Sequence, residues 1–411
     1  MWFAVASAHT GGRLRFGVVV HVPQRVANRT ISKSSAPSKA QPSKLLGFAT
    51  DEKFNIPVSV QQKLGRHLIN RTNHPLGILW SAVQAYMSSQ DGPCRFFDRE
   101  VPIVGTQQCF DDLLVHPEHP SRSPSDTYFV NRDMVLRTHT SAHQVQHMRL
   151  YPQVSAFLCA GDVFRRDEID SSHYPIFHQC EGVRLFETAK LSAKDVEADL
   201  KRTLEGLAGH LFGITPGSRL MRWNDDYFPF TEPSFELEIF HNDSWIEVLG
   251  CGVIHREVLR NADLDPSEVH GWAFGLGLDR LAMVLFNIPD IRLFWSEDIR
   301  FLEQFDEDSF AKGIQFRPFS KYPPVSKDIS AWLPDDFVEN DLFEMIRDEG
   351  GDQVERVEVV DAFTHPKTKR SSKLFRVTWR DMSRTLTHAE VNDMHSKVLE
   401  RVVDELRLEL R

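Results

Sequence analysis

The sequence predicts an α+β fold made of two successive units, and two observations carry this prediction. From Thr127 to about Leu285, short β-like runs alternate with turns and with occasional helical stretches, which favours an antiparallel sheet flanked by helices. The last hundred residues follow the order β-α-β-β-α-β, which is the ferredoxin-like arrangement. The bulk composition of the 411-residue chain, 41% hydrophobic and 26% charged, is that of a soluble globular protein.

Residues 1–45 are predicted to be a transit peptide or disordered leader. Residues 1–50 contain seven Arg or Lys and no Asp or Glu, whereas the whole chain has a formal net charge of −10. A basic, Ser-rich, acid-free leader on an acidic body is typical of an organelle transit peptide, and a disordered basic tail is the alternative. The five cysteines are scattered without a C-x-x-C pair, which favours a reducing compartment. No uninterrupted apolar run reaches 18 residues, so we expect no membrane span.

The first unit is assigned to residues 46–300, with a linker over residues 301–318. Its first clear helix follows Asn73-His74-Pro75, because apolar side chains recur at helical spacing from Leu76 to Met87 and Pro is tolerated in a first turn. The remaining elements expected from periodicity are strands at Ala156–Ala160, Phe235–Phe240 and Trp245–Leu249, and helices at Ala193–Leu211 and from Gly277 to Leu285.

The second unit is assigned to residues 319–411. Its pattern opens with a strand over Ser326–Trp332 and a helix over Glu339–Asp348 that Gly350-Gly351 ends. Thr387 followed by Glu390 is a capping-box sequence that predicts the start of a second helix. The other elements expected here are strands at Val354–Phe363, Lys373–Arg380 and Leu406–Leu410.

Two arginines stand in settings suited to phosphate chemistry. Arg165 lies in Gly161-Asp-Val-Phe-Arg-Arg-Asp167 after a β-like run, and Arg280 follows the glycine-rich Gly275-Leu-Gly-Leu-Asp279 before a helix. A planar guanidinium that is always charged can grip phosphate oxygens and neutralise developing charge. Each arginine alone is more often part of a surface ion pair, and the glycine run matches neither common nucleotide-binding loop.

Seven ordered motifs make the pattern specific. Together they resemble the catalytic module of the phenylalanyl-tRNA synthetases, which are class II aminoacyl-tRNA synthetases, and the C-terminal unit resembles that of the single-chain organellar form. The resemblance covers about four-fifths of the chain. The motifs are Arg137-Thr-His-Thr-Ser-Ala-His-Gln144, Gly161–Asp167, Asp170-Ser-Ser-His173, Phe177-His-Gln-Cys-Glu-Gly182, Phe228-Pro-Phe-Thr-Glu-Pro-Ser234, Glu247-Val-Leu-Gly-Cys-Gly252 and Gly271–Arg280.

The resemblance implies ATP-dependent activation of L-phenylalanine by carboxylate attack on the α-phosphorus. Arg165 is similar to the arginine that holds the α-phosphate and the substrate carboxylate, and Arg280 to the one that holds the γ-phosphate. Glu247 is similar to a carboxylate on the Mg²⁺ or nucleotide side, and a solvated strand glutamate is the alternative. Asp279 is shorter than the Glu that the family often has at this position.

The amino-acid pocket is also implied by the resemblance. Gln179 and Glu181 are similar to the pair that binds the α-ammonium group, and they share a strand face because one residue separates them. Phe228 and Phe230 are expected on one strand face as edge-to-face partners of the substrate ring, although an aromatic pair is usually core. For His173 a purely structural role is the alternative. The other residues expected to line the site are Ser141, Ala142, His143, Gln144, Ser172, His173, Tyr174, Cys180, Ala273 and Phe274.

The expected partner is tRNA(Phe), gripped through a basic turn in the C-terminal unit, where the resembling domain binds the anticodon stem and loop. A solvated charged turn is the ordinary alternative for such a run. Its predicted phosphate-binding cations are Lys367, Lys369, Arg370 and Lys373. The resemblance further implies a monomer in the mitochondrial matrix, with a plastid as the other destination. A catalytically silent RNA-binding relative and a ligase for another acceptor are the competing functions, and the retained Arg165 and Arg280 speak against the first.

Overall fold

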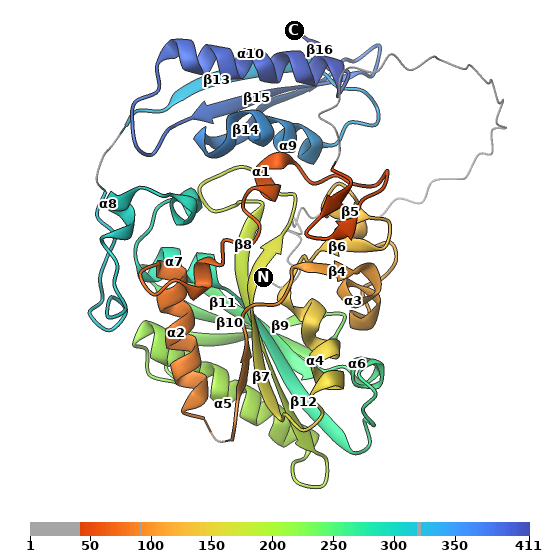
Figure 1. Ribbon diagram of the computed structural model, residues 1–411, viewed down its shortest axis with the longest axis vertical. Coiled ribbons are helices and arrows are strands. Elements are labelled where there is room, and N and C mark those ends of the chain that lie inside the picture. Colours follow the sequence, from red (N-terminus) through yellow and green to blue (C-terminus); the bar gives the residue numbers. More distant parts are fainter. Residues whose placement is uncertain (1–41, 91, 319–321) are drawn as a thin grey trace, which may run out of the picture.

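The computed structural model describes residues 42–90, 92–318 and 322–411, and shows a large domain beneath a smaller C-terminal one (Figure 1). Most of the predicted leader lies outside the described residues. Its last residues belong to the fold, because β1 (Lys44–Leu45) pairs with β2 (Phe48–Ala49) and Leu45 is buried in the large domain's core. In the described part of the chain, no helix has the length and apolarity needed to cross a bilayer.

A seven-stranded sheet organises the large domain. All neighbouring strands are antiparallel except the edge pair β3 and β7, which is parallel. This confirms the α+β prediction of an antiparallel sheet flanked by helices. Across the sheet the strands are β3 (Arg95–Phe97), β7 (Ala156–Phe164), β8 (Ile176–Glu187), β12 (Val269–Gly277), β11 (Ser244–Ile254), β10 (Thr231–His241) and β9 (Met221–Phe228).

Helices cover both faces of this sheet and give each face its own core (Figure 1). On one face pack α2 (Pro75–Ser88), α5 (Ala193–Phe212) and α7 (Leu278–Leu285). On the other face pack α4 (Gln144–Leu150) and α6 (Arg256–Asn261). We call these the first and second cores. Because side chains alternate along a strand, neighbouring residues of β8 or β12 enter different cores.

Local signals explain the two longest helices of the large domain. α5 opens with a reciprocal capping box between Ser192 and Asp195, and it ends at Gly213, whose φ of +67° is the left-handed conformation that glycine adopts without strain. α2 opens with His74, whose ring nitrogen accepts the Leu76 N–H, and with Pro75 in the first turn.

Short elements complete the large domain around the sheet. A small antiparallel sheet has the order β4 (Ile103–Gly105), β6 (Met134–Leu136) and β5 (Phe129–Asn131). The remaining helical turns are α1 (Val58–Gln61), η1 (Leu68–Asn70), α3 (Thr106–Cys109), η2 (Asp111–Leu113), η3 (Pro120–Arg122), η4 (Thr140–His143), η5 (Ile291–Trp295) and α8 (Ile299–Leu302).

The C-terminal domain has the predicted β-α-β-β-α-β order. Its antiparallel sheet runs β14, β15, β13, β16, and both helices pack over one face of it around a third core. The predicted capping box is present, since Thr387 and Glu390 each accept the other's backbone N–H. The elements are β13 (Val325–Trp332), α9 (Glu339–Gly350), η6 (Gly351–Gln353), β14 (Val354–Thr364), β15 (Ser371–Trp379), α10 (His388–Asp404) and β16 (Glu409–Leu410).

The segment predicted as a linker, residues 301–318, packs against the large domain. It begins inside α8, and the side chains of Phe301, Phe305 and Phe316 are buried in the first core. Three buried phenyl rings anchor a segment far more firmly than a solvated linker would be. We therefore propose that the large domain extends to Phe316.

Candidate active site

An open cleft of about 370 Å³ lies at the start of β8, where α7 begins. It brings together side chains from three stretches that are distant in sequence, including both arginines singled out from the sequence. The lining residues are Arg165, Asp167, Ser172, His173, Tyr174, Phe177, Gln179, Glu247, Val248, Gly277, Asp279, Arg280, Leu281, Met283, Val284 and Ile291.

Arg165 enters the cleft directly after β7 ends. Its Nε donates to the Thr138 carbonyl oxygen at 2.9 Å, which fixes the plane of the guanidinium group. The guanidinium carbon lies 5.1 Å from the centre of the Phe177 ring, a cation–π distance. Phe177 was not predicted from the sequence, although the alternation of Phe177, Gln179 and Glu181 along one strand face could have revealed it. The ring gives the cleft a flat apolar wall that suits a nucleotide base.

Arg280 lies in the first turn of α7 and faces Glu247 on β11. Its guanidinium nitrogen is 3.8 Å from the Glu247 carboxylate, and the Arg280 side chain is 49% exposed. Burial first, and then the nearby charges of Glu247 and Asp226, raise the pKa of Glu236 to about 7. The cleft therefore combines arginines that can bind phosphate with the Glu247 carboxylate, which repels the neighbouring Glu236 outside the cleft lining.

The segment from Asp167 to Tyr174 forms one wall of the cleft. Asp170 accepts hydrogen bonds from the Ser172 backbone N–H at 2.6 Å and faces the His173 ring at 2.7 Å. The hydrogen bond to Asp170 outweighs burial and raises the pKa of His173. The Tyr174 hydroxyl donates to Asp352 of the C-terminal domain. The structure thus places Ser172, His173 and Tyr174 in the lining of the cleft.

Beyond Gln179, polar groups continue into the protein interior. Glu181 is fully buried, and burial raises the pKa of its carboxyl group to about 8 although the Ser141 hydroxyl partly offsets this. Among the described residues, no hydrogen bond of ordinary geometry satisfies the Ser141 hydroxyl, either Glu181 carboxylate oxygen or the Gln144 amide. Buried polar groups are nearly always hydrogen-bonded, so this set suits a ligand that carries donors, such as an ammonium group.

The predicted aromatic pair lies in the second core beside this polar set. Phe228 ends β9 and Phe230 lies in the connection to β10, so they do not share one strand face as predicted. Their rings are nearly parallel at 18°, with centroids 6.1 Å apart, and both side chains are buried. Ala142 and Ala273 belong to the same core.

Cys180 and Phe274 correct the prediction of the slot. Both side chains lie in the first core, on the opposite face of the sheet from Gln179 and Ala273. The reason is the alternation of side chains along β8 and β12, which turns adjacent residues to opposite faces. The Phe274 ring instead packs where a side chain on Gly182 would stand, 2.1 Å from that position.

Comparisons with known proteins decide which family this architecture represents. The family model of the tRNA synthetase class II core domain (F) matches residues 64–305, and that of the ferredoxin-fold anticodon binding domain matches residues 320–411. The chain is 50% identical over 368 residues to the "Phenylalanine--tRNA ligase, chloroplastic/mitochondrial" of Arabidopsis thaliana, covering 88% of this chain and 83% of that protein. It is 45% identical over 400 residues to the mitochondrial phenylalanine–tRNA ligase of Mus musculus (89% and 87% covered), and 38% identical over 443 residues to that of Saccharomyces cerevisiae (89% and 93%).

The chain belongs to the single-chain organellar phenylalanine–tRNA ligases. These are the phenylalanyl-tRNA synthetases of the sequence-based resemblance, which is thereby confirmed. An "alpha subunit" of the same activity, from Caldicellulosiruptor saccharolyticus, is 40% identical but covers only 48% of this chain. The similarity to the single-chain relatives extends much further along the chain than this.

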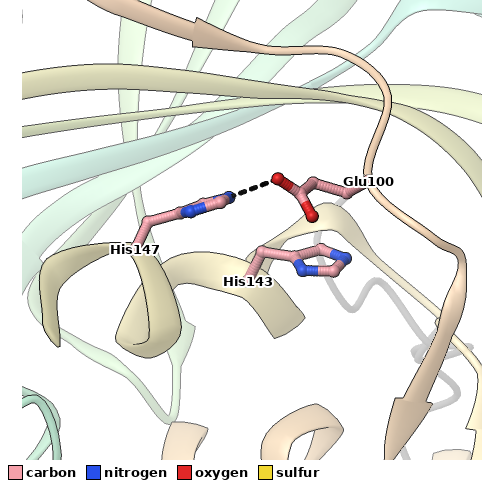
Figure 2. Close-up of side chains that lie close together, drawn as sticks. All are labelled: Glu100, His143 and His147. Carbon is pink, nitrogen blue, oxygen red and sulfur yellow. Dashed lines mark ion pairs between the residues drawn. The ribbon is translucent and has the colours of Figure 1, made fainter. Parts of the chain in front are cut away.

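In this synthetase the His143 side chain has a structural role and does not line the cleft. Figure 2 shows its ring beside Glu100 and His147, with His147 Nε2 3.7 Å from the Glu100 carboxylate. His143 Nε2 accepts from Arg137 at 2.8 Å, and its Nδ1 faces the Gln146 amide oxygen at 3.2 Å. Three such side chains could in principle bind a metal, but both nitrogens of His143 are engaged and one faces a guanidinium cation. We assign the cluster to packing.

The predicted tRNA-binding cations of the synthetase lie in and beside the β14–β15 hairpin. Arg370 pairs with Glu409 at 2.6 Å and Lys373 pairs with Glu339, which leaves Lys367 and Lys369 as hairpin cations for which no ion pair is found among the described residues. Beside them lies an aromatic pair that the sequence analysis did not assign. Trp332 on β13 and Phe363 on β14 are 6.1 Å apart, and Phe363 is 42% exposed.

Proposed function

We propose that this chain activates L-phenylalanine with ATP and transfers it to the terminal adenosine of tRNA(Phe), with Arg165 and Arg280 gripping the triphosphate. The observation that carries this assignment is the convergence of the two arginines in one cleft. Phosphoryl chemistry of this kind needs little covalent help, since positioning and charge neutralisation supply most of the rate. Family membership makes the chain a ligase that forms aminoacyl-tRNA, and these residues are our proposal for how it does so.

In this proposal Arg165 holds the α-phosphate and the substrate carboxylate. Its fixed guanidinium plane, set by the Thr138 carbonyl, lies over the Phe177 ring. A nucleotide base against Phe177 therefore puts its phosphates within reach of the arginine. Arg280, half exposed at the other side of the cleft, is suited to the more mobile γ-phosphate.

The α-ammonium group of phenylalanine binds Gln179 and Glu181. Glu181 is buried with neither carboxylate oxygen in a hydrogen bond of ordinary geometry among the described residues, and an ammonium group supplies both donors and the opposite charge. The phenyl ring then extends toward Phe228, Phe230 and Ala273, which share the second core on this face of the sheet. Aromatic pairs contribute about 0.5–1.5 kcal/mol beyond burial, which favours phenylalanine over aliphatic residues.

Class II synthetases commonly use Mg²⁺ together with ATP. The side of the cleft that carries the Glu247 carboxylate suits this ion. Glu247 lies 15% exposed near Arg280, and its charge helps raise the pKa of Glu236. A divalent cation relieves such repulsion, and Mg²⁺ commonly takes one or two carboxylates together with phosphate oxygens. When bound, the ion would neutralise phosphate charge, and Glu247 and Glu236 would hold it.

The C-terminal domain is proposed to bind the anticodon arm of tRNA(Phe). Lys367 and Lys369 in the hairpin supply charge for phosphates, and Trp332 and Phe363 supply aromatic surface beside them. Single-stranded RNA is recognised by stacking of bases on aromatic side chains together with phosphate contacts. We further propose that the protein acts as a monomer in the mitochondrial matrix, in keeping with relatives named mitochondrial.

Pyrophosphate exchange with each of the twenty amino acids tests the proposed function. We expect exchange with phenylalanine, and loss of about 10²–10³-fold in Arg280→Ala, by analogy with removal of one charge-stabilising donor. Arg222→Ala is the matched control, because Arg222 is similarly exposed (46%) and ion-paired but does not line the cleft. Exchange with no amino acid, or an equal loss in both variants, would contradict the assignment.

A further inference from the structure

A buried histidine ties the start of α7 to two strands of the central sheet. His178 on β8 is fully buried. Its Nδ1 lies 3.2 Å from the carboxylate of Asp279 in the first turn of α7, and its Nε2 lies 3.2 Å from that of Asp162 on β7. Asp162 is also the cross-strand neighbour of His178 in the β7–β8 ladder. One imidazole ring thus joins three adjacent elements.

This contact stands where the regular sheet ends. The β8–β12 ladder runs from Val269 to Gly277, which pairs with Gln179, and the chain then turns directly into α7. The cap residue Gly277 offers no side-chain hydrogen bond to the first turn of the helix. Instead Asp279 accepts the backbone N–H of His178 and faces its ring. The direction of the first turn of α7, which carries Arg280, is therefore set by the contact with His178.

His178 itself does not reach the cleft. Side chains alternate along β8, so Phe177 and Gln179 face the cleft while His178 faces the first core. There the ring of Trp295 stacks against it, with centroids 5.7 Å apart and planes at 26°. Any effect of His178 on the reaction must then pass through the residues that it holds.

The imidazole ring of His178 is positively charged and neutralises buried carboxylates. Burial alone would lower the pKa of His178, but the charges and hydrogen bonds of Asp279 and Asp162 outweigh it and raise that pKa to about 10. The imidazolium ion therefore persists at physiological pH and balances two buried carboxylates. Removing it would leave both carboxylates without their common partner, which is costly in a buried site.

We propose that His178 is a positioning residue for ATP binding, which holds Arg280 in place by pairing with Asp279 while Asp162 fixes its other side. The proposal rests on the proposed role of Arg280 toward the γ-phosphate. The two strands beside β8 keep Gln179 and Glu181 in register through full ladders. The phenylalanine site is consequently much less dependent on His178 than the ATP site is.

Equilibrium binding of ATP and of phenylalanine to His178→Asn, each measured by calorimetry on the full chain, tests this role. We expect the Kd of ATP to rise about tenfold, because the variant loses a buried hydrogen bond to a charged group. The Kd of phenylalanine should change by less than about threefold. The decisive measurement repeats His178→Asn in an Arg280→Ala background. If His178 acts through Arg280, the loss of ATP affinity should disappear there.

Two comparisons separate positioning from general destabilisation. His395→Asn removes another buried histidine, from the third-core side of the C-terminal domain, and should lower the melting temperature without changing the Kd of ATP. If His178→Asn does not fold, Asp279→Asn should weaken ATP binding in the same selective way, and Asp279→Glu, which keeps the charge, should restore it. Equal losses of ATP affinity with and without Arg280 would overturn the proposal, as would unchanged Kd values accompanied only by a smaller folded fraction. Because binding is measured without turnover, a failure of the ligase assignment would be seen separately in pyrophosphate exchange.

Discussion

Phenylalanine binding should release a proton, because the buried Glu181 carboxyl group lies where we place the ammonium group. Burial raises the pKa of Glu181 to about 8, so at neutral pH this group is mostly protonated before the substrate binds. An ammonium ion against it favours the ionised carboxylate and lowers this pKa in the complex. Binding must therefore strengthen as pH rises, and the gain ends once pH exceeds the pKa of the free protein.

The size of the effect follows from that pKa. With a pKa of about 8 in the free protein and an ionised carboxylate in the complex, about 0.9 proton is released per phenylalanine bound at pH 7. By the same linkage, the apparent Kd falls about 50-fold between pH 6 and pH 8. The amino group of phenylalanine stays protonated over this range, so the trend reports the protein and not the substrate.

Isothermal titration calorimetry in buffers of different ionisation enthalpy measures both quantities. The matched control is Glu181→Gln, which imitates the protonated carboxyl group. This variant should bind phenylalanine weakly at pH 8 and lose most of the pH dependence. A Kd that stays constant from pH 6 to pH 8 in the unmodified protein, with no buffer-dependent heat, would refute the reasoning.

Three further predictions concern the other parts of the site. Arg165→Ala should lower the rate of phenylalanine-dependent pyrophosphate exchange by about 10²–10³-fold, and a loss below tenfold would argue against its phosphate role. The Mg²⁺ concentration for half-maximal exchange should rise as pH falls below about 7. The reason is that the raised pKa of Glu236 lets protons compete with the cation for this carboxylate. Glu236→Gln should therefore flatten the pH dependence. Phe363→Ala should lower kcat/KM for tRNA charging by about tenfold, as expected for one lost base-stacking contact, and leave exchange unchanged; reduced exchange would instead indicate misfolding.

The C-terminal domain was predictable almost to its element boundaries because its signals are local. The capping box at Thr387 and the Gly350-Gly351 stop act within a few residues of the helix ends that they define, and both helices form as expected. The large domain was predicted as a class of fold, but not in its strand order. Pairings such as β3 with β7 depend on residues far apart in the chain, which no local pattern encodes.

The corrections at the site share one cause, which is that contact partners are not visible in a single sequence. Cys180 and Phe274 stand inside recognised motifs, yet strand alternation turns their side chains into the first core. His143 lies next to predicted site residues, but Arg137 and Gln146 engage its ring. Phe177, which the sequence analysis passed over, lines the cleft because it shares a strand face with Gln179. A motif indicates which segment forms a site, and only the fold decides which of its side chains face inward.

The contact between the two domains is mainly polar, although Ile169 and Met382 each pack against the core of the other domain, and this bears on how the synthetase can work on a long RNA. Arg166 pairs with Asp341 at 2.9 Å, and Arg347 donates to the Asp167 carbonyl at 2.9 Å, both within two residues of Arg165. Among the described residues of the large domain, only Ile169 adds a buried side chain to the third core. Surfaces joined mainly by ion pairs and hydrogen bonds can separate while exposing little apolar surface, since water replaces those contacts.

The same contacts fall on the segment that carries Arg165, the arginine we propose to bind the α-phosphate. The backbone N–H of Val357 in β14 donates to the Ile169 carbonyl at 2.9 Å, and the Tyr174 hydroxyl in the cleft donates to Asp352. Movement of the C-terminal domain toward an anticodon would therefore release one wall of the cleft that we propose to bind ATP. Phe301, Phe305 and Phe316 hold residues 301–316 on the large domain. Movement of the C-terminal domain must therefore begin after Phe316.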